Sequence, residues 1–88
     1  MKTVIYSQEQ RDYSRAVTEF IEMFGRKYPG QTIEVKNPDT REAASLMSML
    51  GVDRYPAIIV TRDNDAVVQM WQGEPLPLLD EVAAYALG

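Results

Sequence analysis

Residues 51–60 decide the fold of this chain, and they read Gly51-Val52-Asp53-Arg54-Tyr55-Pro56-Ala57-Ile58-Ile59-Val60. The last four residues are continuously apolar, which is typical of a central strand that is buried on both faces of a sheet. Gly51 is suited to end a helix, with Val52 folding back onto it. The stretch therefore predicts a helix end, a short connection through Tyr55-Pro56, and a buried strand.

The residues upstream predict a strand, a helix and a second strand. Residues 3–6 form a short, β-branched apolar run, which is typical of a buried strand. From residue 12 the apolar positions recur at spacings of three and four, which predicts a helix that Pro29-Gly30 ends. Residues 31–36 alternate between apolar and polar side chains, as in an edge strand. The apolar stripe of the helix comprises Tyr13, Val17, Phe20, Ile21, Phe24 and Tyr28.

A second helix is expected between this edge strand and Gly51. Asn37 is the predicted N-cap, Pro38 suits the first helical position, and Asp39 suits the positively polarised first turn. The side chains expected to form its buried stripe are Ala43, Leu46, Met47 and Leu50.

Downstream, residues 57–71 are predicted to form a hairpin with residues 62–65 as its turn. After Gly73 a last helix is expected, with Leu79, Val82, Ala83 and Ala86 on its inner side. The full order is β-α-β-α-β-β-α, and a right-handed crossover makes the first two strands parallel neighbours. The sequence thus predicts one α/β domain over residues 1–88, a four-stranded mixed sheet with three helices.

The composition excludes several classes of function. The chain has no cysteine and no histidine among its 88 residues, so it has no thiolate nucleophile and no thiolate or imidazole metal ligand. Its net charge of −4 argues against nucleic acid as a partner. No apolar run approaches the ~20 residues that cross a bilayer, and no signal-peptide pattern is visible. We therefore expect a cytoplasmic protein with no metal site and no membrane contact.

The order of elements, together with residues 51–60, resembles the thioredoxin-like superfamily in its short form, the glutaredoxins and mini-thioredoxins. In that family the proline that corresponds to Pro56 is cis and faces the active site. A glutaredoxin begins V-I-Y-S, followed by three loop residues and C-P-Y-C. Residues 4–7 match this beginning and Tyr13 matches its aromatic residue, but the two cysteine positions fall on Arg11 and Ser14.

This departure removes the chemistry of the family. Arg11 is not a nucleophile, and the hydroxyl of Ser14 has a pKa far above that of a thiol and no base beside it. Thiol–disulfide exchange by the chain's own residues is excluded. We therefore expect a non-catalytic, redox-inactive domain that binds a protein or a peptide, with no catalytic residue and no required cofactor.

The expected binding groove is formed by residues 8–14, Tyr55-Pro56 and Gly73-Glu74. The resemblance implies that Tyr55, before a cis-proline, offers its backbone N–H and C=O to an extended ligand. These members also have ordinary structural interpretations: Arg11 as a solvated loop charge, Tyr13 as part of the helix stripe, and Tyr55-Pro56 as the tight turn into the strand. Trp71 could border the same groove, and its alternative interpretation is that it covers the core. The candidate ligand-binding residues are Arg11, Tyr13, Ser14, Tyr55, Pro56, Gly73 and Glu74.

Two alternative functions stay open at this point. Glutathione transferases build their first domain on the same fold and use a Ser or Tyr hydroxyl, which implies glutathione as a ligand and Ser7, Tyr13 or Ser14 as its partner. Against this alternative, Gly73-Glu74 offers one carboxylate at most for the amino group of glutathione. The other alternative is a structural role, with self-association through the edge strand at residues 31–36. The oligomeric state is left open by the sequence.

Overall fold

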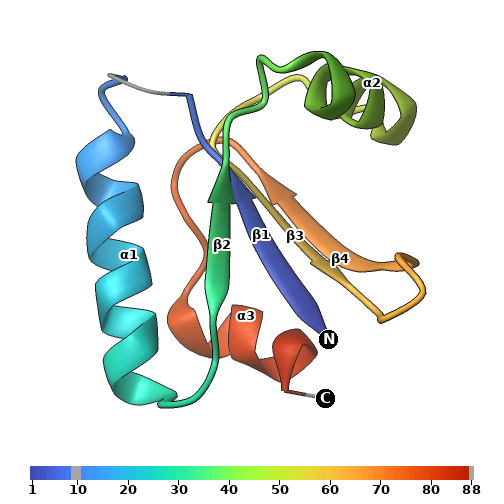
Figure 1. Ribbon diagram of the computed structural model, residues 1–88. Helices are drawn as coiled ribbons and strands as arrows, with labels where there is room; N and C mark the ends of the chain where they lie inside the picture. Colours follow the sequence, from blue (N-terminus) through green and yellow to red (C-terminus); the bar gives the residue numbers. More distant parts are fainter. Residues whose placement is uncertain (9–10, 88) are drawn as a thin grey trace.

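The computed structural model describes residues 1–8 and 11–87 and follows the predicted order of elements (Figure 1). The strands and helices are β1 (Lys2–Tyr6), α1 (Ser14–Lys27), β2 (Ile33–Lys36), α2 (Arg41–Leu50), β3 (Ala57–Thr61), β4 (Val67–Gln72) and α3 (Leu79–Ala86). No helix of the described ranges is both long enough and apolar enough to cross a membrane.

The four strands form one mixed sheet in the order β2-β1-β3-β4. β1 runs parallel to β2, with Thr3 opposite Ile33, and antiparallel to β3, with Val4 opposite Ile59. β3 and β4 form the predicted antiparallel hairpin, whose register shifts between Val60 and Thr61. Residues 57–60 are all buried, as the unbroken apolar run predicted for a central strand.

α1 and α3 cover one face of the sheet, called here the α1–α3 face (Figure 1). Ile5 and Ile58 project from the central strands onto this face, and Phe24 of α1 packs there with only 1% of its surface exposed. α1 buries this stripe because its apolar residues recur at helical spacing. The buried cluster consists of Ile5, Tyr13, Val17, Phe20, Phe24, Ile58, Val60, Val82 and Ala83.

α2 alone covers the opposite face, called here the α2 face (Figure 1). It has ten residues and buries only Ala43 and Met47. Gly51 ends α2 in the left-handed conformation with φ of 74°, and the Val52 N–H donates to the Met47 carbonyl at 2.8 Å, as predicted. The buried cluster of this face consists of Val4, Tyr6, Ala43, Met47, Val52, Ala57 and Ile59.

The predicted start of α2 is wrong by three residues. Thr40, not Asn37, is the N-cap, and its hydroxyl accepts a hydrogen bond from the Ala43 N–H at 3.2 Å. The Asn37 side chain instead accepts from the Asp39 N–H at 2.9 Å. Both residue types favour caps and turns, because their side chains bond nearby backbone amides. Asn37 therefore closes a turn before the helix, and Thr40 caps the helix itself.

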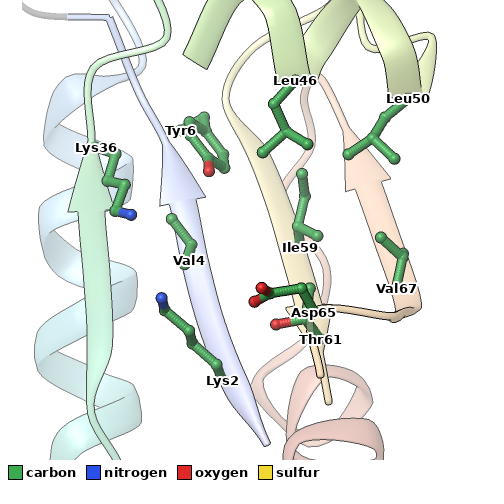
Figure 2. Close-up of a pocket in the computed structure, with 10 residues that line it drawn as sticks. All are labelled: Lys2, Val4, Tyr6, Lys36, Leu46, Leu50, Ile59, Thr61, Asp65 and Val67. Atoms are coloured by element: carbon green, nitrogen blue, oxygen red, sulfur yellow. The ribbon is translucent and has the colours of Figure 1, made fainter. Parts of the chain in front are cut away.

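Leu46 is the second correction. It was expected in the buried stripe of α2, but 37% of its surface is exposed. Leu50, one turn further along, is also only partly buried. Both side chains point from α2 toward the part of the sheet that this short helix does not cover (Figure 2).

Candidate functional site

Tyr55 and Pro56 form the centre of the candidate site, in the connection between α2 and β3. The peptide bond between them is cis, as the family resemblance implied. Pro56 is buried, and its carbonyl accepts a hydrogen bond from the Gly73 N–H at 3.0 Å. This bond continues the pairing of β3 and β4 beyond Ala57 and Gln72. It places Gly73 beside Pro56, and both residues were expected in the groove.

The Tyr55 backbone is unpaired within the described part of the chain. Neither its N–H nor its C=O forms a hydrogen bond with another described residue. Its side chain is half-buried and packs against the clusters of both sheet faces. This free amide and carbonyl form a candidate pairing site for an extended ligand.

The environment of the Tyr55 hydroxyl is partly apolar and partly acidic. Burial raises the pKa of Tyr55 above its ordinary value, and the carboxylates of Asp39 and Asp53 raise it further. Both carboxylates belong to exposed residues, so their charges lie at the rim of the site. The local potential thus disfavours a negative group beside this hydroxyl.

Gly73 occupies a backbone position that favours glycine. Its φ of 75° lies in the left-handed region, and a Cβ atom there would lie 3.5 Å from the Cβ of Arg54. The Arg54 side chain therefore lies directly over this glycine. Glu74, the next residue, is exposed and is joined to Pro75 by a second cis peptide bond.

Tyr13 belongs to the core rather than to an open groove. It is 9% exposed and is part of the cluster on the α1–α3 face. Its hydroxyl accepts from the Gln8 N–H at 3.1 Å and donates to the Gln8 side-chain oxygen at 3.1 Å. The structural interpretation of Tyr13 as a member of the helix stripe is thus confirmed, and its hydroxyl organises the loop that precedes α1.

Arg11 and Ser14 hold each other in a turn at the start of α1. The Arg11 N–H donates to the Ser14 hydroxyl at 3.1 Å, and the Ser14 N–H donates to the Arg11 carbonyl at 3.0 Å. The Arg11 residue is exposed. Residues 9 and 10, which belong to the expected groove segment 8–14, lie outside the described residues.

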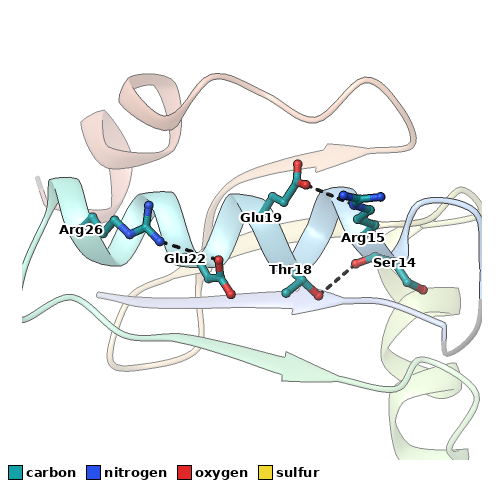
Figure 3. A network of polar contacts seen from close by, with 6 residues as sticks. All are labelled: Ser14, Arg15, Thr18, Glu19, Glu22 and Arg26. Carbon is teal, nitrogen blue, oxygen red and sulfur yellow. Dashed lines mark hydrogen bonds and ion pairs between the residues drawn. The ribbon is translucent and has the colours of Figure 1, made fainter.

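The outer face of α1 carries a line of polar contacts that starts at Ser14 (Figure 3). The Thr18 hydroxyl donates to the Ser14 carbonyl at 3.1 Å. Further along, Arg15 pairs with Glu19 at 3.4 Å, and Arg26 pairs with Glu22 at 4.0 Å. These pairs are largely exposed and one helical turn apart, so they support the helix rather than form a site.

The hydroxyls proposed for glutathione chemistry are already engaged locally. Ser14 accepts from a backbone amide, Tyr13 is bonded to Gln8, and Ser7 donates to the Gln8 carbonyl at 3.5 Å. Among the residues that the structure describes, no group of three or more Asp or Glu side chains is arranged to hold a metal ion.

A further residue that the sequence reasoning missed is Tyr6. It was assigned only to a buried strand, but its hydroxyl faces a cavity of about 290 Å³ between α2 and the sheet (Figure 2). Lys2 lies four residues earlier on the same strand, and Lys36 lies opposite Tyr6 on β2. The sequence of β1 already indicates that Lys2 and Tyr6 lie together, because alternate residues of a strand, here Lys2, Val4 and Tyr6, share one face.

Comparison with solved structures supports the fold. The chain is similar to reduced desulfothioredoxin from Desulfovibrio vulgaris Hildenborough, with a TM-score of 0.71 and 22% sequence identity. The match covers 98% of this chain and 78% of that one. The sequence matches no protein-family model, and no curated protein shows significant similarity to it.

Proposed function

We propose that this domain, which has the thioredoxin-like fold but no cysteine, binds an extended peptide segment of a partner protein at Tyr55. Its own residues perform no thiol–disulfide exchange, because the thiolate that the reaction needs is absent. In this function the domain recognises a partner protein but does not carry out thiol–disulfide exchange.

The free backbone of Tyr55 carries this proposal. An extended segment placed beside Tyr55 satisfies both its N–H and its C=O by pairing as one short rung of a sheet. Val52, three residues before Tyr55, is buried in the cluster of the α2 face, and the following strand β3 is buried on both faces of the sheet. The pairing groups are therefore already positioned before a ligand arrives, which lowers the entropic cost of binding.

The charges around Tyr55 favour a basic residue in the ligand. The carboxylates of Asp39 and Asp53 act on the Tyr55 hydroxyl, and Glu74 is exposed on the neighbouring segment. The Arg54 side chain lies over Gly73, so the acidic preference is local to the Tyr55 hydroxyl. We expect selected peptides to place Lys or Arg next to the residue that pairs with Tyr55.

The test is selection of peptides from a random heptapeptide library, followed by amide NMR titration of the labelled domain with a selected peptide. Saturable shifts are expected at Tyr55, Ala57 and Gly73. Each backbone amide of the peptide is then N-methylated in turn, which removes one donor without changing a side chain. Methylation at one position is expected to lower the affinity about tenfold, because a single peptide residue pairs with Tyr55.

Small, uniform losses at every methylated position would contradict backbone pairing. Tyr55→Ala is expected to weaken binding, and Tyr85→Ala on the exposed side of α3 is the matched control. Because Tyr55 packs against both clusters, the folding of each variant is checked by its own amide spectrum. Reduced glutathione and a scrambled tripeptide, titrated in parallel, examine the glutathione alternative at the same residues.

A further inference from the structure

The cavity on the α2 face is a separate site from the Tyr55 region. It has a volume of about 290 Å³ and lies where α2 stops short of the end of the sheet (Figure 2). Its floor is formed by Val4 of β1 and Ile59 of β3. Leu46 and Leu50 close it from α2, and Val67 closes it from β4.

The polar and apolar groups of this cavity lie on different sides. The amines of Lys2 and Lys36 point toward Val4 on the β1–β2 side (Figure 2). The apolar side chains of Leu46, Leu50 and Val67 gather on the side of α2, β3 and β4. A ligand that fits this division has a negative end and an apolar body.

Tyr6 supplies a polar group that a ligand in the cavity can contact. Only 6% of the residue is exposed, and its hydroxyl pairs with no other described residue. Because no buried side-chain oxygen of the described residues lacks a partner, this hydroxyl oxygen is open to the solvent of the cavity. The hydroxyl points into the cavity, on the same side as the two amines (Figure 2). Burial raises the pKa of Tyr6, the charge of Lys2 partly opposes this effect, and the charge of Glu34 adds to it. The neutral hydroxyl is therefore a donor that faces the cavity with its proton available.

The acidic groups near the cavity leave the two amines available. Lys36 pairs with Glu34 at 3.8 Å, but both side chains are about half exposed, and such a pair contributes little. Lys2 forms no ion pair with another described residue. Asp65 lies beside Thr61 on the β3 side, so its charge disfavours an anion there and favours one near the lysines (Figure 2).

We propose that this cavity binds a small apolar monocarboxylate, independently of the peptide site. The carboxylate accepts hydrogen bonds from the Tyr6 hydroxyl and from the amines of Lys2 and Lys36. The apolar body packs on Leu46, Leu50 and Val67. Because a water molecule takes roughly 30 Å³ of liquid, the cavity holds roughly ten non-hydrogen atoms, which is the size of octanoate.

The test is amide NMR titration of the labelled domain with octanoate, octanol and octylammonium, which share one apolar body and differ in the charge of the head. Octanoate is expected to shift Tyr6, Lys36, Leu50 and Val67 saturably, and to bind about tenfold more tightly than octanol. Octylammonium is expected to leave these residues unshifted, because its positive ammonium group is repelled by the positive amines of Lys2 and Lys36.

Variants separate recognition by the head from simple hydrophobic contact. Lys2→Met with Lys36→Met keeps the apolar stems and is expected to weaken octanoate about tenfold while leaving octanol unchanged. Tyr6→Phe removes only the hydroxyl and is expected to weaken octanoate by roughly threefold. Arg26→Met on the outer face of α1 removes a cation far from the cavity and is the control. The amide spectrum of each variant reports its folding.

Three outcomes would overturn this proposal. One is the absence of saturable shifts at the cavity residues with octanoate. A second is equal binding of octanol or octylammonium in the native domain. A third is tighter binding, at the same residues, of a dipeptide with an apolar side chain and a free terminal carboxylate, which would assign the cavity to a protein C-terminus. Failure at the peptide site leaves the result unchanged, because the Tyr55 and Tyr6 resonances report the two sites separately.

Discussion

The two faces of the sheet are built from the same strands but are covered very differently. On the α1–α3 face, two helices close over the strands and bury large aromatic side chains such as Phe20 and Phe24. On the α2 face, one ten-residue helix buries only Ala43 and Met47 and leaves a cavity beside it. The α1–α3 face is therefore closely packed, whereas the α2 face has room for a ligand.

The largest effect is expected from truncating a side chain on the closed face. Phe24→Ala should cost about 3–5 kcal/mol of the free energy of unfolding, because it leaves a void among packed neighbours. Leu46→Ala on the open face should cost less than about 1 kcal/mol, because this side chain is already 37% exposed. Urea unfolding followed by circular dichroism measures both. Equal losses would show that the two faces are equally closed.

Adding side-chain atoms, instead of removing them, should also affect the stability of the two faces differently. Ile58 and Ile59 are neighbours on β3, and both are almost fully buried, but only Ile59 borders the cavity. Ile58→Phe should destabilise the domain by about 1–3 kcal/mol, since the closed core has no space for extra atoms. Ile59→Phe should cost less than about 1 kcal/mol and should reduce octanoate binding. A larger loss of unfolding free energy for Ile59→Phe than for Ile58→Phe, in the same urea experiment, would show that the α2 face is not the more open one.

The next effect concerns α2, whose small buried surface makes it depend on its N-cap. Thr40→Ala removes the hydroxyl that accepts from the Ala43 N–H and should cost about 1 kcal/mol. Thr40→Ser, which keeps the acceptor, should restore most of the loss. Ser45→Ala, at an exposed position within α2, is the control and should be neutral or slightly stabilising. Amide hydrogen exchange within α2 checks whether the loss is local to this helix.

The smallest effect is expected at an exposed cluster that joins α1 to α3. Lys27 pairs with Asp80 at 2.8 Å, and the Tyr28 hydroxyl also donates to Asp80. The bond from Lys27 and then that from Tyr28 lower the pKa of Asp80 below its ordinary 3.8. Since the folded pKa lies below the unfolded one, this stabilisation is present above about pH 4 and is lost as the pH falls through the folded value.

Asp80→Asn should remove this part of the pH dependence of stability, measured by urea unfolding from about pH 7 down to about pH 2.5. Because the cluster is exposed, the change should be small and should shrink further in high salt. Asp12→Asn, at another exposed position, is the charge-matched control. An unchanged profile for Asp80→Asn would assign the acid sensitivity to other carboxylates.

The fold was largely predictable because its decisive signals are local. The apolar run at residues 57–60, the helical spacing of Val17, Phe20 and Phe24, and the glycine at position 51 each specify one element. Their order then leaves few ways to connect a sheet. The start of α2 was not predictable, because Asn37 and Thr40 are both good caps and the choice depends on which face of the helix packs.

The candidate sites were predictable only in part. The proximity of Pro56 and Gly73 followed from the family resemblance, and their hydrogen bond agrees with it. The cavity was missed because its existence depends on how far α2 reaches across the sheet, which no spacing in the sequence reports. For the same reason, Leu46 was expected in the core and Tyr6 was not considered as a ligand-binding residue.

The position of β1 in the sheet has a consequence for how the chain is made. β1 lies between β2 and β3, so its two hydrogen-bonded edges need partners from residues 33–36 and 57–61. β1 is synthesised before β2 and β3, and its second edge has no partner until β3 has left the ribosome. At a synthesis rate of roughly 5–20 residues per second, the apolar segment at residues 3–6 lacks this second partner strand for several seconds. We expect a nascent chain that ends before residue 57 to bind chaperones through this segment, and a chain extended through β4 to be released.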